Sequence, residues 1–393
     1  MATTAEQMRA HRGPAILTGG FRPFFLFGAI WAAIAVALWL PIFEGHFTLP
    51  TALSPIDWHV HELLYGYLAA AVAGFLLTAI PNWTGRLPVV GRRLGWLVAL
   101  WGLGRVAMLI SGLVGAWVGA VLDAAFLLSL TAVTAREVWT GENWRNLRVV
   151  GLVALMAIGN VVFHVEAILV GTAAYGTRIG IAAAVVLIAL IGGRIVPSFT
   201  MNWLRPRGPG AMPVPFARFD AVVIGVSSAA LALWVVRPSG PITGAVLVVA
   251  GLFQAARLQR WVGWRTAGEK LVLVLHVAYL FVPLGFLLLG GVELGALPIL
   301  PSAALHAWTV GAIGLMTLAV MTRASLGHTG RPLHATRAIQ AIYAGGVVAV
   351  AARIAMGLGT AEFVFLHLAV VGWLVAFAGF AIVYFPILAR PRA

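Results

Sequence analysis

The stretch SPIDWHVHELLYGYLAAAVAGFLLTAIPNWTGR, residues 54–86, decides the fold of this chain. Most of it is apolar, and about 20 apolar residues are enough for a helix to cross a bilayer. Ser54-Pro55-Ile56-Asp57 has the residues of a helix start, with Ser as N-cap, Pro in the first turn and Asp close behind. His59, His61 and Glu62 follow at once, and ionisable side chains inside a membrane are costly and usually functional. The stretch therefore predicts a transmembrane helix that carries a site.

The rest of the chain has the same apolar character. Of its 393 residues, 61% are hydrophobic and 10% are charged, whereas about a quarter of a soluble protein is charged. Long apolar runs without alternation predict an all-α polytopic membrane protein rather than a barrel. The net charge of +14 does not indicate a nucleic-acid partner, because the arginines cluster in short segments between apolar runs. The absence of cysteine excludes thiolate metal sites, iron–sulfur clusters and covalently attached haem.

Twelve segments are long and apolar enough to be membrane spans. They cover residues 24–43, 59–80, 94–115, 117–136, 148–170, 178–200, 217–236, 240–258, 270–290, 303–323, 337–357 and 361–386. Most of the 26 basic residues fall in the termini and in every second gap. The gap after the eighth span, for example, carries Arg257, Arg260, Arg265 and Lys270.

This asymmetry predicts that the termini and the basic gaps are cytoplasmic. No cleavable signal peptide is evident in the polar and basic residues 1–20. Residues 1–23 are then a cytoplasmic N-terminal segment, residues 24–386 a single transmembrane domain, and residues 387–393 a cytoplasmic tail.

A faint internal repeat relates the second predicted span to the tenth. His61 and Thr84-Gly85-Arg86 recur, shifted by 245 residues, as His306 and Thr329-Gly330-Arg331. The sixth span ends in IVPSFT, residues 195–200, which resembles the AIPNWT of the second span. Because these spans are four apart, the repeat suggests three units of four helices.

Five histidines fall at one predicted depth, in the outer half of the membrane. They are His59, His61, His164, His306 and His367, while His276 lies toward the inner side of the ninth span. A helix–helix hydrogen bond explains a single intramembrane histidine as readily as a metal does. Five at one depth favour metal binding, because neutral imidazole is the commonest metal ligand, and haem iron, copper and zinc all suit it. His59 and His61 point about 200° apart on a helix and do not easily share one ion.

Other ionisable residues in or near the spans are candidate partners of such a site. Glu62 and Glu166 either fix imidazole tautomers or face water at the interface. Arg105 and Arg194 lie inside spans and must be paired or face a polar cavity. A haem propionate, a transported anion or helix carbonyls would serve as their partner, and Asp123 is the alternative ion-pair partner of Arg105.

Four motifs resemble the NnrS family of bacterial membrane proteins. They are GFRPFF (20–25), WHVHE (58–62), GFLLTAIPNWTGR (74–86) and HTGRP (328–332), and the resemblance runs from about residue 15 to the last span. It implies a twelve-span protein of the bacterial inner membrane that binds haem and copper. It also implies a part in the nitric oxide response of denitrifying and other bacteria, where the family relieves nitrosative stress. Among the motif residues, His59, His61 and Glu62 are the ones that can bind a metal or support a ligand.

The first hypothesis is a haem- and copper-binding protein that acts on nitric oxide or its iron adducts. His61 and His306 would be axial ligands of a non-covalent, b-type haem, as histidines on spans 2 and 10 are in haem–copper oxidases. Arg105 and Arg194 would balance the propionates. His59, His164 and His367, with His276 less favoured, are the candidates for copper or a second haem. The chain lacks the adjacent histidine pair and the His-x-x-x-Tyr of an oxidase copper site, so an identical active site is not expected.

Two other functions fit the same residues. A twelve-helix secondary transporter would use the histidines to relay protons or bind a substrate, and its arginines would meet an anion. A haem-based sensor or sink would bind nitric oxide without turnover. The sequence predicts neither the catalytic residues nor the electron donor.

Overall fold

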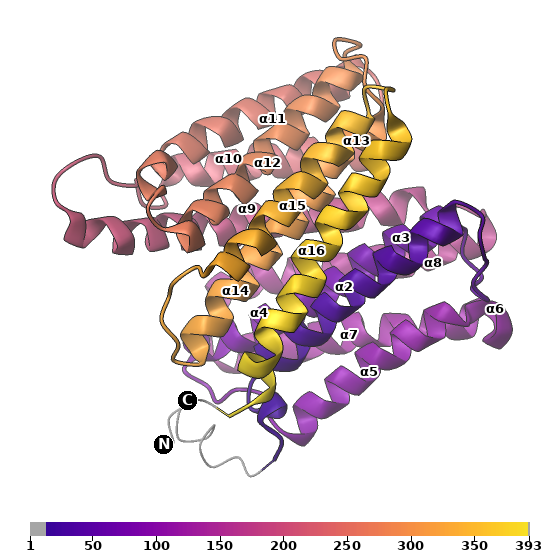
Figure 1. Ribbon diagram of the computed structural model, residues 1–393, viewed down its shortest axis with the longest axis horizontal. Coiled ribbons are helices and arrows are strands. Elements are labelled where there is room, and N and C mark those ends of the chain that lie inside the picture. Colours follow the sequence, from indigo (N-terminus) through magenta and orange to yellow (C-terminus); the bar gives the residue numbers. More distant parts are fainter. Residues whose placement is uncertain (1–12, 392–393) are drawn as a thin grey trace. The chain divides into compact units, whose positions relative to one another are not determined.

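The computed structural model describes residues 13–391, which form helices joined by loops and contain no strand (Figure 1). Eleven helices in this part of the chain are long and apolar enough to cross a membrane. They are α2 (Phe21–Phe43), the continuous α3–η2–α4 (Pro55–Thr84), α7 (Ala116–Thr140), α8 (Leu147–Leu169), α9 (Ala174–Leu204), α10 (Arg218–Val236), α11 (Pro241–Gln259), α12 (Lys270–Glu293), the continuous α13–η6–α14 (Pro301–His328), α15 (Arg337–Met356) and α16 (Glu362–Ala389). The protein is therefore an all-α, multi-pass membrane protein, as the sequence predicts.

The remaining predicted span, residues 94–115, corresponds to α5 (Arg92–Leu109). This helix has 18 residues, of which Arg92, Arg93 and Arg105 are charged, so it is less apolar than the other eleven. It ends earlier than predicted, and the four-residue α6 (Ser111–Val114) follows. The short helices η1 (Ala15–Leu17), η3 (Trp144–Asn146), η4 (Arg205–Arg207) and η5 (Gly263–Thr266) complete the description. Residues 1–12 of the predicted N-terminal segment lie outside the described residues.

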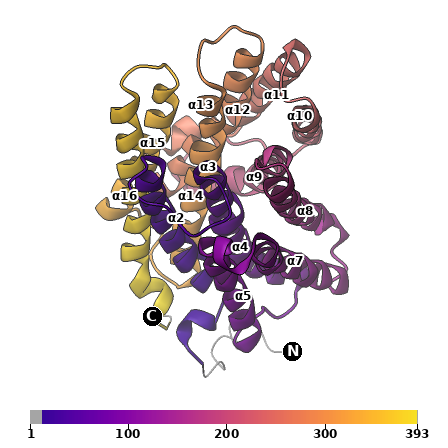
Figure 2. The ribbon, with the colours of Figure 1, turned by 90° about the vertical axis from the view of Figure 1, so that its right-hand side faces the viewer.

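The described residues group into two compact units. Unit 1 comprises residues 13–183, 324–331 and 380–391, and unit 2 comprises residues 184–323 and 332–379. In unit 1, α7 contacts α4, α5 and α8, and α5 lies beside it along its length (Figure 1). In unit 2, α11 lies between α10 and α12 (Figure 2). The helix α12 also contacts η6 (Ala307–Leu315).

The helix that begins the second span starts as its sequence predicts. The Ser54 hydroxyl accepts a hydrogen bond from the backbone N–H of Asp57 (3.1 Å) and donates one to the Asp57 carboxylate (2.7 Å). Pro55 occupies the first helical position, where its missing N–H costs nothing. At the other end, Gly85 adopts a left-handed conformation (φ 69°) that stops α4.

Two spans contain a π-helical segment, η2 (Glu62–Tyr67) and η6 (Ala307–Leu315). Each begins directly after a histidine, His61 or His306, so the two segments start 245 residues apart like the sequence repeat. A π-helix rotates the residues beyond it relative to an α-helix and is frequent at functional sites. The sequence does not predict these segments.

The second part of the repeat, Thr84-Gly85-Arg86 and Thr329-Gly330-Arg331, also has similar local structure at its two positions. The Thr84 hydroxyl donates to the carbonyl of Ile80 (2.9 Å), and the Thr329 hydroxyl donates to the carbonyl of Ser325 (2.6 Å). The glycine after each threonine, at 85 and 330, has a positive φ. The shift of 245 residues therefore matches backbone geometry as well as residue identity.

The helices α11 and α12 approach each other closely where Gly244 faces Gly290. A Cβ on Gly290 would lie 2.8 Å from the carbonyl oxygen of Gly244, and a Cβ on Gly244 would lie 2.9 Å from that of Gly290. Small residues are the usual means by which membrane helices approach each other closely.

We expect Gly290→Ala to destabilise the protein by about 1–3 kcal/mol, because the added methyl forces the two backbones apart. Gly225→Ala in α10 is the matched control, since a Cβ there would meet no atom within 4 Å. Thermal unfolding of the two variants in detergent measures the difference. Equal melting temperatures would show that α11 and α12 do not pack this closely.

Candidate metal centre

A buried cluster of polar side chains joins five helical segments of unit 1. His61 ends α3 and Glu62 begins η2, while Arg105 lies in α5 and Asp123 in α7. Asn160 and His164 of α8 complete the cluster; being four residues apart, they share one face of that helix. All six residues are at most 4% exposed. Charges this deeply buried must be paired with one another or with a bound ion.

Asp123 brings two histidines together. Its Oδ2 lies 3.1 Å from His61 Nε2 and 2.9 Å from His164 Nε2. One ligand atom from each of the three residues lies within 4.8 Å of the others. Metal–ligand bonds of about 2.0–2.1 Å in a tetrahedral site place neighbouring ligand atoms about 3.3 Å apart. The three side chains are therefore spaced so that small movements would place them around one metal ion.

The hydrogen bonds of His61 show which kind of partner its Nε2 atom requires. His61 Nδ1 lies 2.9 Å from Glu62 Oε1, and an ionised carboxylate only accepts, so Nδ1–H donates. The Asn160 amide nitrogen donates to Asp123 (2.8 Å), which turns Asn160 Oδ1 toward His61 Nε2 at 3.2 Å. Two oxygen acceptors thus converge on Nε2. A proton or a metal cation must lie between them, because acceptor lone pairs repel one another.

Arg105 connects the two carboxylates of the cluster. It donates from Nη1 to Glu62 Oε2 (2.6 Å) and from Nη2 to Asp123 Oδ1. The indole N–H of Trp31 donates to the same Glu62 oxygen (2.7 Å). With both imidazoles neutral, two carboxylates and one guanidinium leave a net charge of −1. A single positive charge would make this buried cluster neutral.

Gly66, one turn into η2, gives the guanidinium room. A Cβ at this position would clash with Arg105 Nη1 and would lie 3.1 Å from both Glu62 Oε2 and Trp31 Nε1. Any larger residue would therefore push Arg105 away from the helix. This explains why a glycine lies five residues after His61.

The other predicted site residues of the first half of the chain, His59 and Glu166, have different partners and do not join the two imidazoles. The His59 ring lies against the Trp39 ring at a tilt of 33°, with ring centroids 4.2 Å apart. Glu166 accepts hydrogen bonds from the backbone N–H groups of Tyr175 (3.0 Å) and Gly176 (2.7 Å), where it caps the start of α9. Among the described residues, the carboxylate that joins the two imidazoles is Asp123 and not Glu166.

The predicted site residues of the second half lie in unit 2. His276 Nε2 lies 2.8 Å from the Thr200 hydroxyl, a helix–helix hydrogen bond between α12 and α9. His367 Nδ1 lies 2.9 Å from the carbonyl of Phe363, one turn earlier in α16. Arg194 is half-buried in α9. The pairing of His61 with His306, which lie in different units, stays a prediction.

Unit 2 contains a buried polar network that sequence analysis missed. Arg257 Nε donates to Asp220 Oδ1 (2.9 Å), and Arg257 Nη1 donates to the Tyr279 hydroxyl (2.9 Å). Tyr279 donates to Gln254, whose amide donates to Ser227. Arg257 is fully buried in α11, so assigning it to a basic loop was wrong. The indication was available, because Asp220 and Arg257 both fall inside predicted spans.

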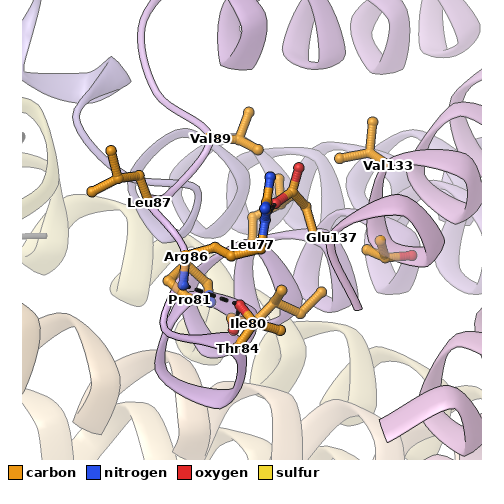
Figure 3. A pocket seen from close by; sticks show the side chains of 10 residues that line it. Leu77, Ile80, Pro81, Thr84, Arg86, Leu87, Val89, Val133 and Glu137 are labelled. Carbon is orange, nitrogen blue, oxygen red and sulfur yellow. Dashed lines mark hydrogen bonds and ion pairs between the residues drawn. The ribbon is translucent and has the colours of Figure 1, made fainter. Parts of the chain in front are cut away.

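The motif GFLLTAIPNWTGR ends at a small pocket between α4 and α7 (Figure 3). Ile80, Pro81 and Arg86 line one side, and Glu137 of α7 lines the other, 2.6 Å from Arg86 Nε. Asn143 donates from its amide to the carbonyl of Trp83. These contacts fix the end of α4 against the end of α7, which accounts for the motif structurally.

The chain matches the family described as NnrS protein over residues 15–392, which is nearly its full length. The chain therefore belongs to the NnrS family, which confirms the resemblance carried by its four motifs. No curated protein matches it.

Proposed function

We propose that this NnrS-family protein binds a copper ion through His61, Asp123 and His164 and acts on nitric oxide or its iron adducts, relieving nitrosative stress. The buried His–Asp–His group is the observation that carries the proposal. Family membership supports the choice of copper and nitric oxide. The proposal places the chain in the bacterial inner membrane with α5 as a twelfth span and both termini cytoplasmic.

The donor set fits copper. Two imidazole nitrogens and one carboxylate oxygen suit copper, zinc or iron, and the family resemblance favours copper among them. Three protein ligands leave a coordination position open, as in catalytic sites. An ion held there would bind nitric oxide or exchange one electron with a donor yet to be identified.

The surrounding residues would prepare these ligands. Glu62 holds the Nδ1 proton of His61, which leaves the Nε2 lone pair directed at the ion. Arg105 and Trp31 fix Glu62, and Arg105 also fixes the second oxygen of Asp123. The net charge of −1 favours a monovalent cation in this apolar setting.

The same geometry does not suit His61 as a haem ligand. A haem iron bound to Nε2 would bring the porphyrin plane to the position where Asp123 Oδ2 and Asn160 Oδ1 lie, at 3.1 and 3.2 Å. The proposal therefore assigns His61 to the ion. The non-covalent haem that the family resemblance implies would take other ligands.

Metal analysis and spectroscopy of the purified protein test the proposal. After expression with copper, we expect about one copper per chain and, once the bound copper has been oxidised, a Cu(II) electron paramagnetic resonance signal that nitric oxide abolishes or changes. Protein that retains no stoichiometric metal and responds to no nitric oxide would favour the transporter. Nitric oxide consumption with an added electron donor, followed with an electrode, distinguishes an enzyme from a sensor or sink.

A further inference from the structure

The surroundings of η6 in unit 2 repeat those of η2 in unit 1. In unit 1, η2 contacts the preceding span, α2, and the following helix, α5. In unit 2, η6 contacts the preceding span, α12, and the following helix, α15. In each case a histidine ends the short α-helix before the π-helix. Arg105 of the following helix donates to Glu62, the residue after His61, whereas Arg353 of the following helix donates to His306 itself. His306 therefore corresponds to His61, and Arg353 is the arginine of the following helix in unit 2, although the residue that corresponds to Arg105 at the shift of 245 is Val350.

The two arrangements differ in charge. The residue that corresponds to Glu62 at the shift of 245 is Ala307, and the one that corresponds to Asp123 is Leu368. The metal centre of unit 1 has one more negative than positive charge. The arrangement in unit 2 has a histidine and an arginine but neither carboxylate, so it carries a net positive charge.

Arg353 is held by neutral acceptors. His306 Nδ1 lies 2.5 Å from the carbonyl of Ser302, to which it donates, so its Nε2 accepts from Arg353 Nη2 at 2.9 Å. Arg353 Nη1 donates to the sulfur of Met356 (3.2 Å), which is a weak acceptor. Within residues 13–391, no carboxylate forms an ion pair with Arg353.

A half-buried guanidinium without a counter-ion is costly near a membrane and is stabilised by an anion. Its planar set of five N–H groups matches two oxygens of one carboxylate, nitrite or phosphate group. The contacts to His306 and Met356 use two of these groups and leave the others for a ligand. His306 orients the guanidinium and does not itself carry the charge.

We propose that His306 and Arg353 form an oxyanion-binding site, the charge-reversed counterpart of the metal centre. The anion is either a small inorganic oxyanion or the phosphate of an anionic lipid headgroup, since both present the same oxygens. This site is separate from the proposed copper ion, so either proposal can fail without the other.

The test measures anion binding to the full-length protein in detergent after delipidation. Calorimetric titrations use sodium nitrite and inorganic phosphate, and native mass spectrometry measures retained phosphatidylglycerol. The variants are Arg353→Gln, Arg353→Lys and His306→Gln. The matched control is Arg237→Gln, which removes an exposed arginine of unit 2.

We expect Arg353→Gln to weaken binding at least tenfold and Arg353→Lys to weaken it less, while Arg237→Gln leaves it unchanged. Loss of nitrite or phosphate binding identifies a free-anion site, and loss of phosphatidylglycerol alone identifies a lipid site. Binding that is the same in wild type, Arg353→Gln and Arg353→Lys for all three probes overturns the proposal. Metal content, measured in parallel, should be unchanged in every variant.

Discussion

Chains with His164→Ala or Asp123→Asn are expected to lose nearly all bound copper, with affinity reduced roughly 100-fold or more. Loss of an outer partner of a metal ligand alone costs about 10–100-fold in affinity, so loss of a ligand should cost at least as much. Asp123→Asn should have the larger effect, because Asp123 Oδ2 contacts both imidazoles and its charge attracts the cation. Competition with a chromophoric chelator measures the affinity directly.

The matched controls are His59→Ala and His367→Ala. The sequence places both histidines at the predicted depth of the site, but the structure places His59 against Trp39 and His367 against Phe363. We expect both variants to keep the copper affinity of the wild type. If His164→Ala retained copper while His59→Ala lost it, the metal centre would be located wrongly.

The membrane helices follow from the sequence because their cause is local. A run of apolar residues between Arg-rich gaps predicts a span without knowledge of the neighbouring helices. Ser54 as N-cap and Gly85 as C-cap likewise mark the ends of the second span. The π-helical segments could not be predicted, because one shifted hydrogen bond leaves no trace in composition. The early end of α5 at Leu109 has no such marker either.

The candidate site was predicted only in part. His61, Glu62 and His164 were recognised as polar residues in apolar spans. His61 was assigned to haem and His164 to copper or a second haem, because depth in the membrane does not show which side chains meet. Asp123 was considered as an ion-pair partner of Arg105, and that ion pair is present. Its contacts with both imidazoles depend on how α3, α7 and α8 pack, which one sequence does not show.

The predicted depth of the histidines in the membrane also indicated the buried polar groups less well than the pairing of opposite charges does. The metal centre combines two carboxylates with one arginine, and the network of unit 2 pairs Asp220 with Arg257. In both, a buried charge is matched by another on a neighbouring helix, as an apolar environment requires. Searching predicted spans for opposite charges would have found both groups.

Arg105→Gln is expected to destabilise the fold by about 3–5 kcal/mol, because it leaves two buried carboxylates without their guanidinium. Its matched control is Arg86→Gln, which breaks the Arg86–Glu137 ion pair. That pair is 36% and 18% exposed, so water can replace the lost partner and the cost should be about 1 kcal/mol or less. Thermal unfolding in detergent compares the two variants.

Two further measurements test whether unpaired charge is the cause of the stability lost in Arg105→Gln. Glu62→Gln added to Arg105→Gln restores the net charge to −1 and should recover part of the lost stability. Copper should raise the melting temperature of Arg105→Gln more than that of the wild type, because the cluster then holds two uncompensated negative charges instead of one. If Arg105→Gln melted like Arg86→Gln, and copper stabilised it no more than the wild type, Arg105 would not hold the carboxylates of the metal centre. Such a result would also remove the charge argument for a cation between His61 and Asp123.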